Sequence, residues 1–129
     1  DLRSARQLGL KTSGNASRGV SSPPSPRPNN FYMQAGKLSL DELLADIKEG
    51  LFVTEMMGKG MSIITGDYSR GAKGFKIENG KITYPVAEVT IASNLIDMWK
   101  NSTPAKDLYF RYGIDAPSIR VSEMTVAGD

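Results

Sequence analysis

Four consecutive polar residues near the middle of the chain carry side chains that could do chemistry. Asp67, Tyr68, Ser69 and Arg70 bring together a carboxylate, a phenol, a hydroxyl and a guanidinium, with a glycine on each side. They supply varied hydrogen-bond donors and acceptors. If Asp67 and Arg70 pair, they fix the local backbone; if Arg70 has no such partner, its guanidinium can clamp a carboxylate or another anion. Composition favours the structural role, and Asp67, Tyr68 and Arg70 are our candidates for a functional site or a structural loop.

Short runs of β-forming residues surround this segment and must position it. We expect the polar run to lie in a loop or an irregular strand that crosses a β core. Met56, Met57 and Met61 precede it, and adaptable core packing explains them better than a peptide-gripping patch. The strands are expected at residues 51–56 and 61–65 before the polar run, and at residues 74–78, 81–84 and 86–91 after it.

Asn79-Gly80 is the clearest turn signal in the chain, because both residues tolerate the positive φ that a type I′ turn requires. A two-residue loop at this point fixes the register of the two strands that it joins. Pro85 lacks an N–H group, so the ladder is interrupted there or the residue lies at a sheet edge. The expected cross-strand pairs are Glu78 with Lys81, Ile77 with Ile82, and Phe75 with Tyr84.

Two short helices are expected beside the strands. Ser39 and Glu42 form a capping box ahead of a run with one apolar face, and Gly50 is expected to end that helix. Ser93 or Asn94 caps a second helix.

Further short strands complete the predicted fold, and residues 2–10 carry a weak amphipathic trace compatible with the tail of another helix. The sequence therefore predicts an α+β fold that is predominantly antiparallel β, with twisted sheets in a sandwich- or barrel-like core and two short helices. The additional strands are expected at residues 29–33, 107–112, 116–121 and 124–127.

Residues 1–37 differ from the rest of the chain in charge and composition. They hold six basic residues and one acidic residue, a net charge of +5, whereas the remainder carries −3. Residues 21–28 form a proline- and serine-rich tract, which predicts an extended surface segment. Because the chain starts at Asp1 without Met, we expect residues 1–37 to be a basic, extended segment continuing from a missing amino-terminal domain. Residues 38–129 are then a β-rich carboxy-terminal domain.

The basic charges of this segment are dispersed, and no aromatic residue interleaves with them before Phe31. A nucleic-acid site usually shows clustered basic residues on one face. The pattern therefore argues against nucleic acid as a partner.

The chain contains no histidine and no cysteine. A zinc site normally uses imidazole or thiolate ligands, and a serine or cysteine triad uses imidazole as its base. We therefore expect no catalytic residue, no metal ligand and no cofactor in this chain. It also has no apolar run near the length needed to cross a bilayer, so we expect a soluble, cytoplasmic protein without a membrane partner.

Several stretches spread over nearly the whole chain form one combination of motifs. They are residues 4–15 (SARQLGLKTSGN), 30–33 (NFYM), 50–55 (GLFVTE), 65–75 (TGDYSRGAKGF) with 77–80 (IENG), 91–95 (IASNL), and 117–118 (PS) through 124–128 (MTVAG). In this order they resemble the carboxy-terminal domain of the TldD/PmbA family, and specifically its PmbA (TldE) branch, also named modulator of DNA gyrase or peptide maturation protein.

The resemblance implies a role in proteolysis without an active site in this chain. In that family a TldD subunit and its PmbA-like partner form a heterodimeric zinc-dependent protease that acts on small or unfolded peptides, in peptide-antibiotic maturation and antitoxin degradation. The zinc-binding HExxxH motif belongs to the TldD subunit, and nothing in this sequence matches it. The resemblance thus implies that a TldD-like partner holds the zinc, while this chain contributes subunit interface and part of a peptide chamber.

Two alternatives remain open at this stage. The family's older name and the basic first 37 residues leave room for a DNA- or gyrase-interacting regulatory module, whose binding to DNA would depend on salt. Self-association of the fragment is also open, because a missing half would leave apolar surface uncovered.

Overall fold

The computed structural model describes residues 1–128 as two compact units. Unit 1 consists of residues 1–32 and 110–115, and unit 2 consists of residues 33–109 and 116–128. The predicted α+β class with mainly antiparallel strands is confirmed, and the described strands form open sheets without a closed barrel. The boundary after residue 37 that composition suggests stays a prediction.

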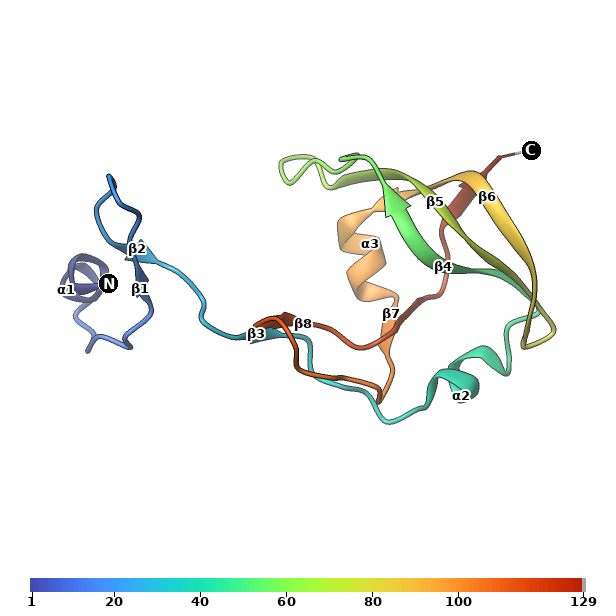
Figure 1. Cartoon of the computed structure of the whole chain (residues 1–129), viewed down its shortest axis with the longest axis horizontal. Coiled ribbons are helices and arrows are strands. Elements are labelled where there is room, and N and C mark those ends of the chain that lie inside the picture. Colours follow the sequence, from blue (N-terminus) through green and yellow to red (C-terminus); the bar gives the residue numbers. More distant parts are fainter. Residues whose placement is uncertain (129) are drawn as a thin grey trace. The chain divides into compact units, whose positions relative to one another are not determined.

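A four-stranded antiparallel sheet is the main element of unit 2 (Figure 1). It contains the edge strand that was predicted at residues 124–127, which pairs antiparallel with residues 90–92. The order of the strands is β10 (Thr125–Ala127), β6 (Lys81–Asn94), β5 (Asp67–Glu78) and β4 (Glu49–Met57).

The core of unit 2 lies against this sheet. Tyr68 and Ala72 of β5 are buried together with Val89 and Ile91 of β6. Since Tyr68 and Ala72 are four residues apart on one strand, their side chains share a face. The partly buried apolar residues that pack on this cluster are Leu51, Val53, Val86, Met124, and Leu95 and Met98 of α3 (Leu95–Lys100).

The β5–β6 turn confirms the strongest local prediction. Asn79 and Gly80 have φ angles of 49° and 77°, as a type I′ turn requires, and the two pairs nearest the turn lie opposite each other as expected. The third predicted pair is wrong, because Phe75 lies opposite Pro85 and not Tyr84. The register shifts between Phe75 and Ile77, so a bulge moves the later pairs by one residue.

The capping box at the start of α2 (Leu40–Leu44) is confirmed. The Ser39 hydroxyl accepts from the Glu42 N–H at 3.2 Å, and the Glu42 carboxylate accepts from the Ser39 N–H at 2.7 Å. The hydrogen bond from the Ser39 N–H, and a second one that the Ser39 hydroxyl donates to the carboxylate at 2.9 Å, hold the pKa of Glu42 below its ordinary value. The predicted helix end at Gly50 is wrong. The helix ends at Leu44, and Gly50 already lies in β4, opposite Ile77 of β5.

The other two helices are also short and capped by side chains. The Asn94 side chain accepts from the Ile96 N–H at 3.0 Å and begins α3, as predicted. The weak amphipathic trace at the start of the chain is a third helix, α1 (Leu2–Leu8), which Asp1 caps and which ends at Gly9 with a φ of 65°. The described residues therefore contain three helices where two were expected.

Three two-stranded sheets complete the structure. One predicted strand, residues 107–112, is wrong, because the Asp115 carboxylate accepts from the backbone N–H groups of residues 111–113 and holds a bend there. Unit 1 contains the antiparallel pair β1 (Ala16–Ser17) and β2 (Ser25–Pro26) and the parallel pair β3 (Phe31–Tyr32) and β8 (Ile114–Asp115); unit 2 contains the antiparallel pair β7 (Ser102–Pro104) and β9 (Ile119–Val121).

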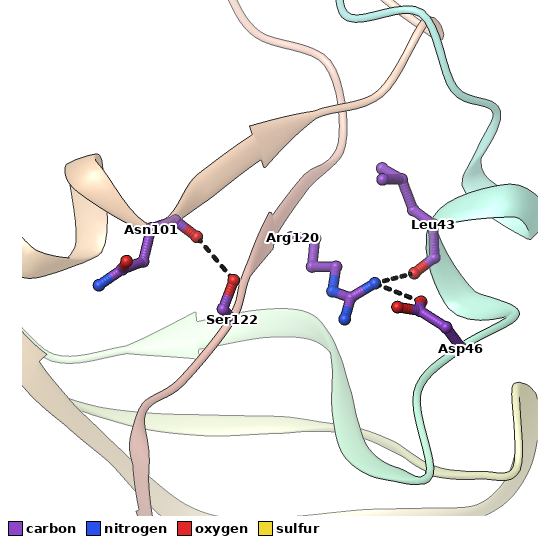
Figure 2. A network of polar contacts seen from close by, with 5 residues as sticks. All are labelled: Leu43, Asp46, Asn101, Arg120 and Ser122. Carbon is purple, nitrogen blue, oxygen red and sulfur yellow. Dashed lines mark hydrogen bonds and ion pairs between the residues drawn. The ribbon is translucent and has the colours of Figure 1, made fainter.

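Arg120 on β9 joins two distant parts of unit 2 (Figure 2). Its guanidinium donates to the Leu43 carbonyl at the end of α2 at 3.0 Å and forms an ion pair with Asp46. At the other end of β9, the Ser122 hydroxyl donates to the Asn101 carbonyl at 3.2 Å. The hydrogen bond from Arg120 is the main cause that holds the pKa of Asp46 below its ordinary value of 3.8.

This pairing predicts part of the acid sensitivity of the fold. Because the folded-state pKa of Asp46 is lowered, its carboxylate stabilises the fold above about pH 4, and this contribution is lost as the pH falls through the folded-state pKa. We expect Asp46→Asn and Arg120→Ala each to reduce the slope of melting temperature against pH below about pH 4. Equal slopes for wild type and both variants, measured by circular dichroism, would show that the pair contributes nothing.

Gly74 gives a second prediction, because β4 and β5 approach too closely there for a side chain. A Cβ atom on Gly74 would lie 1.9 Å from the Phe52 carbonyl oxygen, whereas one on Gly71 of the same strand would lie 3.6 Å from its nearest neighbour. We expect Gly74→Ala to lower the free energy of unfolding in urea by at least about 2 kcal/mol. The matched control Gly71→Ala should change it by less than about 1 kcal/mol; similar losses for both would contradict the steric explanation.

Candidate functional site

The three residues chosen from the sequence all lie at the start of one strand, directly after a loop. This loop, which we call the β4–β5 loop, spans residues 58–66 and joins β4 to β5 (Figure 1). Asp67, Tyr68 and Arg70 are among the first four residues of β5. Asp67 contacts the loop, whereas Tyr68 and Arg70 contact the end of β4. The polar run is therefore the regular start of a strand, and the irregular segment is the loop before it.

Asp67 closes the end of the loop. Its carboxylate accepts from the Thr65 hydroxyl at 2.6 Å, and its backbone carbonyl accepts from the Ser62 N–H at 2.9 Å. The Ser62 carbonyl in turn accepts from the Gly66 N–H at 2.9 Å. The strand predicted at residues 61–65 is therefore wrong: these bonds make a turn, and a single bridge from Met61 to Tyr68 is what remains of strand pairing.

Tyr68 belongs to the core. Its side chain is only 9% exposed, and its hydroxyl donates to the sulfur of Met56 at 3.0 Å. Met56 is near the end of β4, so this bond ties the strand before the loop to the strand after it. A phenol in this position cannot reach a ligand directly, and it acts by fixing β4 against β5.

Arg70 holds the backbone at the end of β4. Its Nε donates to the Met57 carbonyl at 3.5 Å, and its Nη2 donates to the Met56 carbonyl at 3.4 Å. Among residues 1–128 no ion pair joins Arg70 to Asp67. The expected pairing with Asp67 is therefore wrong, and the guanidinium instead donates to main-chain carbonyls 13 and 14 residues away in the sequence.

Residues that sequence reasoning missed complete the support of the loop. The Asn94 amide donates to the Thr65 carbonyl at 3.3 Å, and the Leu95 N–H donates to the Gly66 carbonyl at 2.7 Å. Gly60 accepts from the Ser69 N–H at 2.7 Å, and a Cβ on Gly60 would lie 1.5 Å from the Ser69 carbonyl oxygen. The paired glycines at positions 58 and 60 were the signal for such a close approach.

The outer surface of the loop is apolar. Ile63 and Ile64 are 84% and 97% exposed, and Met61 is 52% exposed. Met56 and Met57 are also exposed, so the expectation that these methionines pack in the core is wrong. The loop thus combines polar contacts underneath with apolar side chains at its tip.

The donor atoms of this chain do not fit a zinc ion. Histidine and cysteine are missing from the sequence, and residues 1–128 contain no cluster of three or more carboxylates that could hold a metal. No reaction step through a metal can be built on its own side chains. In the same residues, no helix combines the length and the apolar character that a bilayer crossing needs.

Each unit contains a shallow cleft. A cleft of about 460 Å³ in unit 1 is lined by aromatic residues, among which Tyr32 and Phe110 meet edge to face at 5.2 Å. A cleft of about 320 Å³ in unit 2 is lined by residues that include Asp97 and Glu123. Neither of these two clefts includes a residue of the β4–β5 loop.

Sequence comparisons connect the chain to metallopeptidases. The family model described as the PmbA/TldA metallopeptidase C-terminal domain matches residues 1–128. The chain is 48% identical to the metalloprotease PmbA of Escherichia coli O157:H7 over 97% of this chain and 26% of that protein. It is 30% identical to a metalloprotease TldD homolog of Buchnera aphidicola, over 99% of this chain and 30% of that protein. The chain thus spans about a quarter of the length of its PmbA relatives.

Solved structures share the fold. A crystal structure of a protein described as a modulator of a DNA gyrase from Thermotoga maritima is 32% identical and has a TM-score of 0.80, over 98% of this chain and 29% of that chain. TldE from Thermococcus kodakarensis is 22% identical and has a TM-score of 0.79, over 96% of this chain and 29% of that chain. The second likeness is one of fold alone.

The hydrogen bonds under the loop predict its dynamics. We expect Asp67→Ala to raise amide exchange rates at residues 62–66 by about 10-fold, because one of the bonds that close the turn is lost. Global stability should change by less than about 1 kcal/mol, since the side chain is exposed. Glu123→Ala, which removes an exposed carboxylate outside the loop, is the control for hydrogen exchange measured by NMR. Unchanged exchange in Asp67→Ala would show that the carboxylate does not hold the turn.

Proposed function

The chain belongs to the PmbA/TldD metallopeptidase family, of which it is a carboxy-terminal domain, and we propose that it is a non-catalytic part of a PmbA-type (TldE) subunit that pairs with a zinc-bearing TldD-type subunit. In this proposal the pair is a heterodimeric peptidase in the cytoplasm. The domain contributes subunit contacts and one wall of a chamber that admits small or unfolded peptides. Peptide-antibiotic maturation and antitoxin degradation are the processes in which we place it.

The proposal rests on a contrast between the family to which the chain belongs and the metal-binding side chains that the chain contains. The relatives are named metalloproteases, yet this domain contains no imidazole and no thiolate. A catalytic zinc ion needs such ligands and an open coordination position. The metal would therefore be bound outside this chain, and this domain would shape the space around the reaction.

Two features of the sheet support a peptide-facing role. In the described residues β4 pairs only with β5, so its other edge is open to an extended peptide, which could add as a further strand. The β4–β5 loop follows directly on that edge, and Asp67, Tyr68 and Arg70 hold it in place. In the proposal these three residues line or support the substrate path, with Tyr68 acting through Met56 because its own side chain is buried.

A DNA- or gyrase-interacting regulatory module is the second candidate. Two solved structures that resemble this chain carry the name modulator of DNA gyrase, and residues 1–37 have a net charge of +5. If DNA binds through such charges, the logarithm of the binding constant should fall linearly with the logarithm of the salt concentration. A measurable slope with purified protein and duplex DNA would favour this candidate, and its absence favours the peptidase.

The test of the proposal is reconstitution of the full-length parent with a TldD-type subunit. We expect the mixture to cleave an unfolded peptide, a chelator to abolish cleavage, and the parent alone to be inactive, because the metal ligands lie in the other subunit. Chelator-sensitive cleavage by the parent alone, or none by the mixture, would refute the pairing.

The same assay tests the site. We expect Ala at both Asp67 and Arg70 to lower kcat/KM by about 10-fold, because the loop beside the substrate path is no longer held in one position. Glu123→Ala is the matched control, since it removes an exposed charge elsewhere in unit 2. Unchanged cleavage by the double variant would show that the loop does not contribute to the path.

A further inference from the structure

We propose that Asn79 is a modification site, which deamidates to aspartate and isoaspartate when the β5–β6 turn opens, and that the segment between α2 and β4 keeps this turn closed. Asn79 is the only one of the six asparagines in the sequence that a glycine follows. The reaction uses only the Asn79-Gly80 dipeptide and water. It is therefore independent of the proposed pairing of subunits.

The chemistry is an attack by the backbone on a side chain. The Gly80 nitrogen bonds to the side-chain carbonyl carbon of Asn79, and the side-chain nitrogen leaves as ammonia, together with the proton that the Gly80 nitrogen gives up. The product of this step is a succinimide ring. Water then opens the ring at either carbonyl and gives aspartate or isoaspartate, so ammonia is exchanged for water without oxidation or reduction. A glycine in the second position favours the attack, because it has no side chain beside the nitrogen and its backbone rotates freely.

The attacking nitrogen is occupied in the folded domain. The Gly80 N–H donates to the Ile47 carbonyl at 2.8 Å, and the Asn79 N–H donates to the Lys48 carbonyl at 2.8 Å. A nitrogen whose proton is held in a hydrogen bond is a poor nucleophile, and breaking that bond in a half-buried position costs free energy. The turn must therefore leave the segment after α2 before the ring can close.

The backbone conformation opposes ring closure as well. Asn79 and Gly80 have the φ angles of a type I′ turn, 49° and 77°, and the pair Glu78 and Lys81 closes the ladder beside them. Formation of the ring needs a rotation of the backbone at Asn79, which these paired strands resist. Space is also limited, because a Cβ on Gly80 would lie 2.8 Å from the Ala45 carbonyl oxygen.

Arg120 holds the protecting segment in place (Figure 2). Its guanidinium donates to the Leu43 carbonyl at 3.0 Å and pairs with Asp46, the residue directly before Ile47. The acceptor of the Gly80 N–H is thus fixed from β9. All these residues belong to unit 2, so the protection does not depend on what a longer polypeptide places around the domain.

Deamidation is irreversible and changes the turn that it occurs in. Both products add a negative charge next to Glu78, and isoaspartate also lengthens the backbone by a methylene group. The length of a hairpin turn sets the register of its strands, so isoaspartate moves the Gly80 N–H away from Ile47. A transient opening of the segment after α2 is thereby converted into a permanent loosening of its contact with the sheet.

The first experiment compares the full-length parent in mildly alkaline buffer with the same protein in guanidinium chloride, with mass spectrometry of the peptide that contains Asn79. We expect deamidation to be at least about 10-fold slower in the folded protein, because the reaction proceeds only from the open turn. Equal rates in the two states would overturn the protection. A lack of deamidation at Asn79 in the unfolded protein would overturn the site itself.

The second experiment tests the protecting segment with variants of the folded parent. We expect Arg120→Ala to raise the deamidation rate of Asn79 by about 3-fold or more, because the acceptor of the Gly80 N–H is no longer fixed. Asp46→Ala, which adds no new asparagine, should act in the same direction and replaces Arg120→Ala if that variant does not fold. The matched control is Ser122→Ala, which removes a hydrogen bond at the other end of β9 and should deamidate like wild type.

The other asparagines show whether an increase is local. Asn101, which a serine follows, reports opening of the whole unit, and its rate should stay at the wild-type value in Arg120→Ala. An unchanged rate at Asn79 in both Arg120→Ala and Asp46→Ala would overturn the role of the segment. An equal rise in Ser122→Ala, or a parallel rise at Asn101 in Arg120→Ala, would also overturn it, because the stability of the whole domain would then control the reaction.

Discussion

One strand, β5, has to fill the core and hold the β4–β5 loop with the same few residues. Because side chains alternate along a strand, Tyr68 and Ala72 enter the core while Asp67 lies on the exposed side and closes the turn. Tyr68 serves both tasks, since its ring is buried and its hydroxyl reaches Met56. Tyr68 therefore couples the end of β4, just before the loop, to the packing of the core.

Local rules predicted the elements that local interactions determine. The capping box at Ser39 and the type I′ turn at Asn79 each depend on residues within four positions of one another, and both are present as expected. The register of Phe75 and the end of α2 depend on how β5 meets its two neighbours, and both were missed. Bulges and ladder ends are set by contacts between distant strands, which residue spacing does not record.

Composition identified the residues of the candidate site but not the role of each one. Asp67, Tyr68 and Arg70 stand out as a polar run, and in the structure Asp67 contacts the loop while Tyr68 and Arg70 contact the end of β4. Arg70 binds backbone carbonyls. Because every residue has a backbone carbonyl, the sequence does not indicate which ones Arg70 binds. The strand expected at residues 61–65 is wrong because β-branched residues favour strands where they pack against neighbours, whereas Ile63 and Ile64 are exposed on a turn.

Exposed isoleucines on a well-bonded turn make no contribution to folding that the chain could not obtain from polar residues at the same positions. The hydrogen bonds from Asp67, Asn94 and Leu95 order the turn beneath them, and ordering a loop costs conformational entropy. What the order determines is a surface: the exposed apolar residues Ile63 and Ile64, in a loop that follows the open edge of β4.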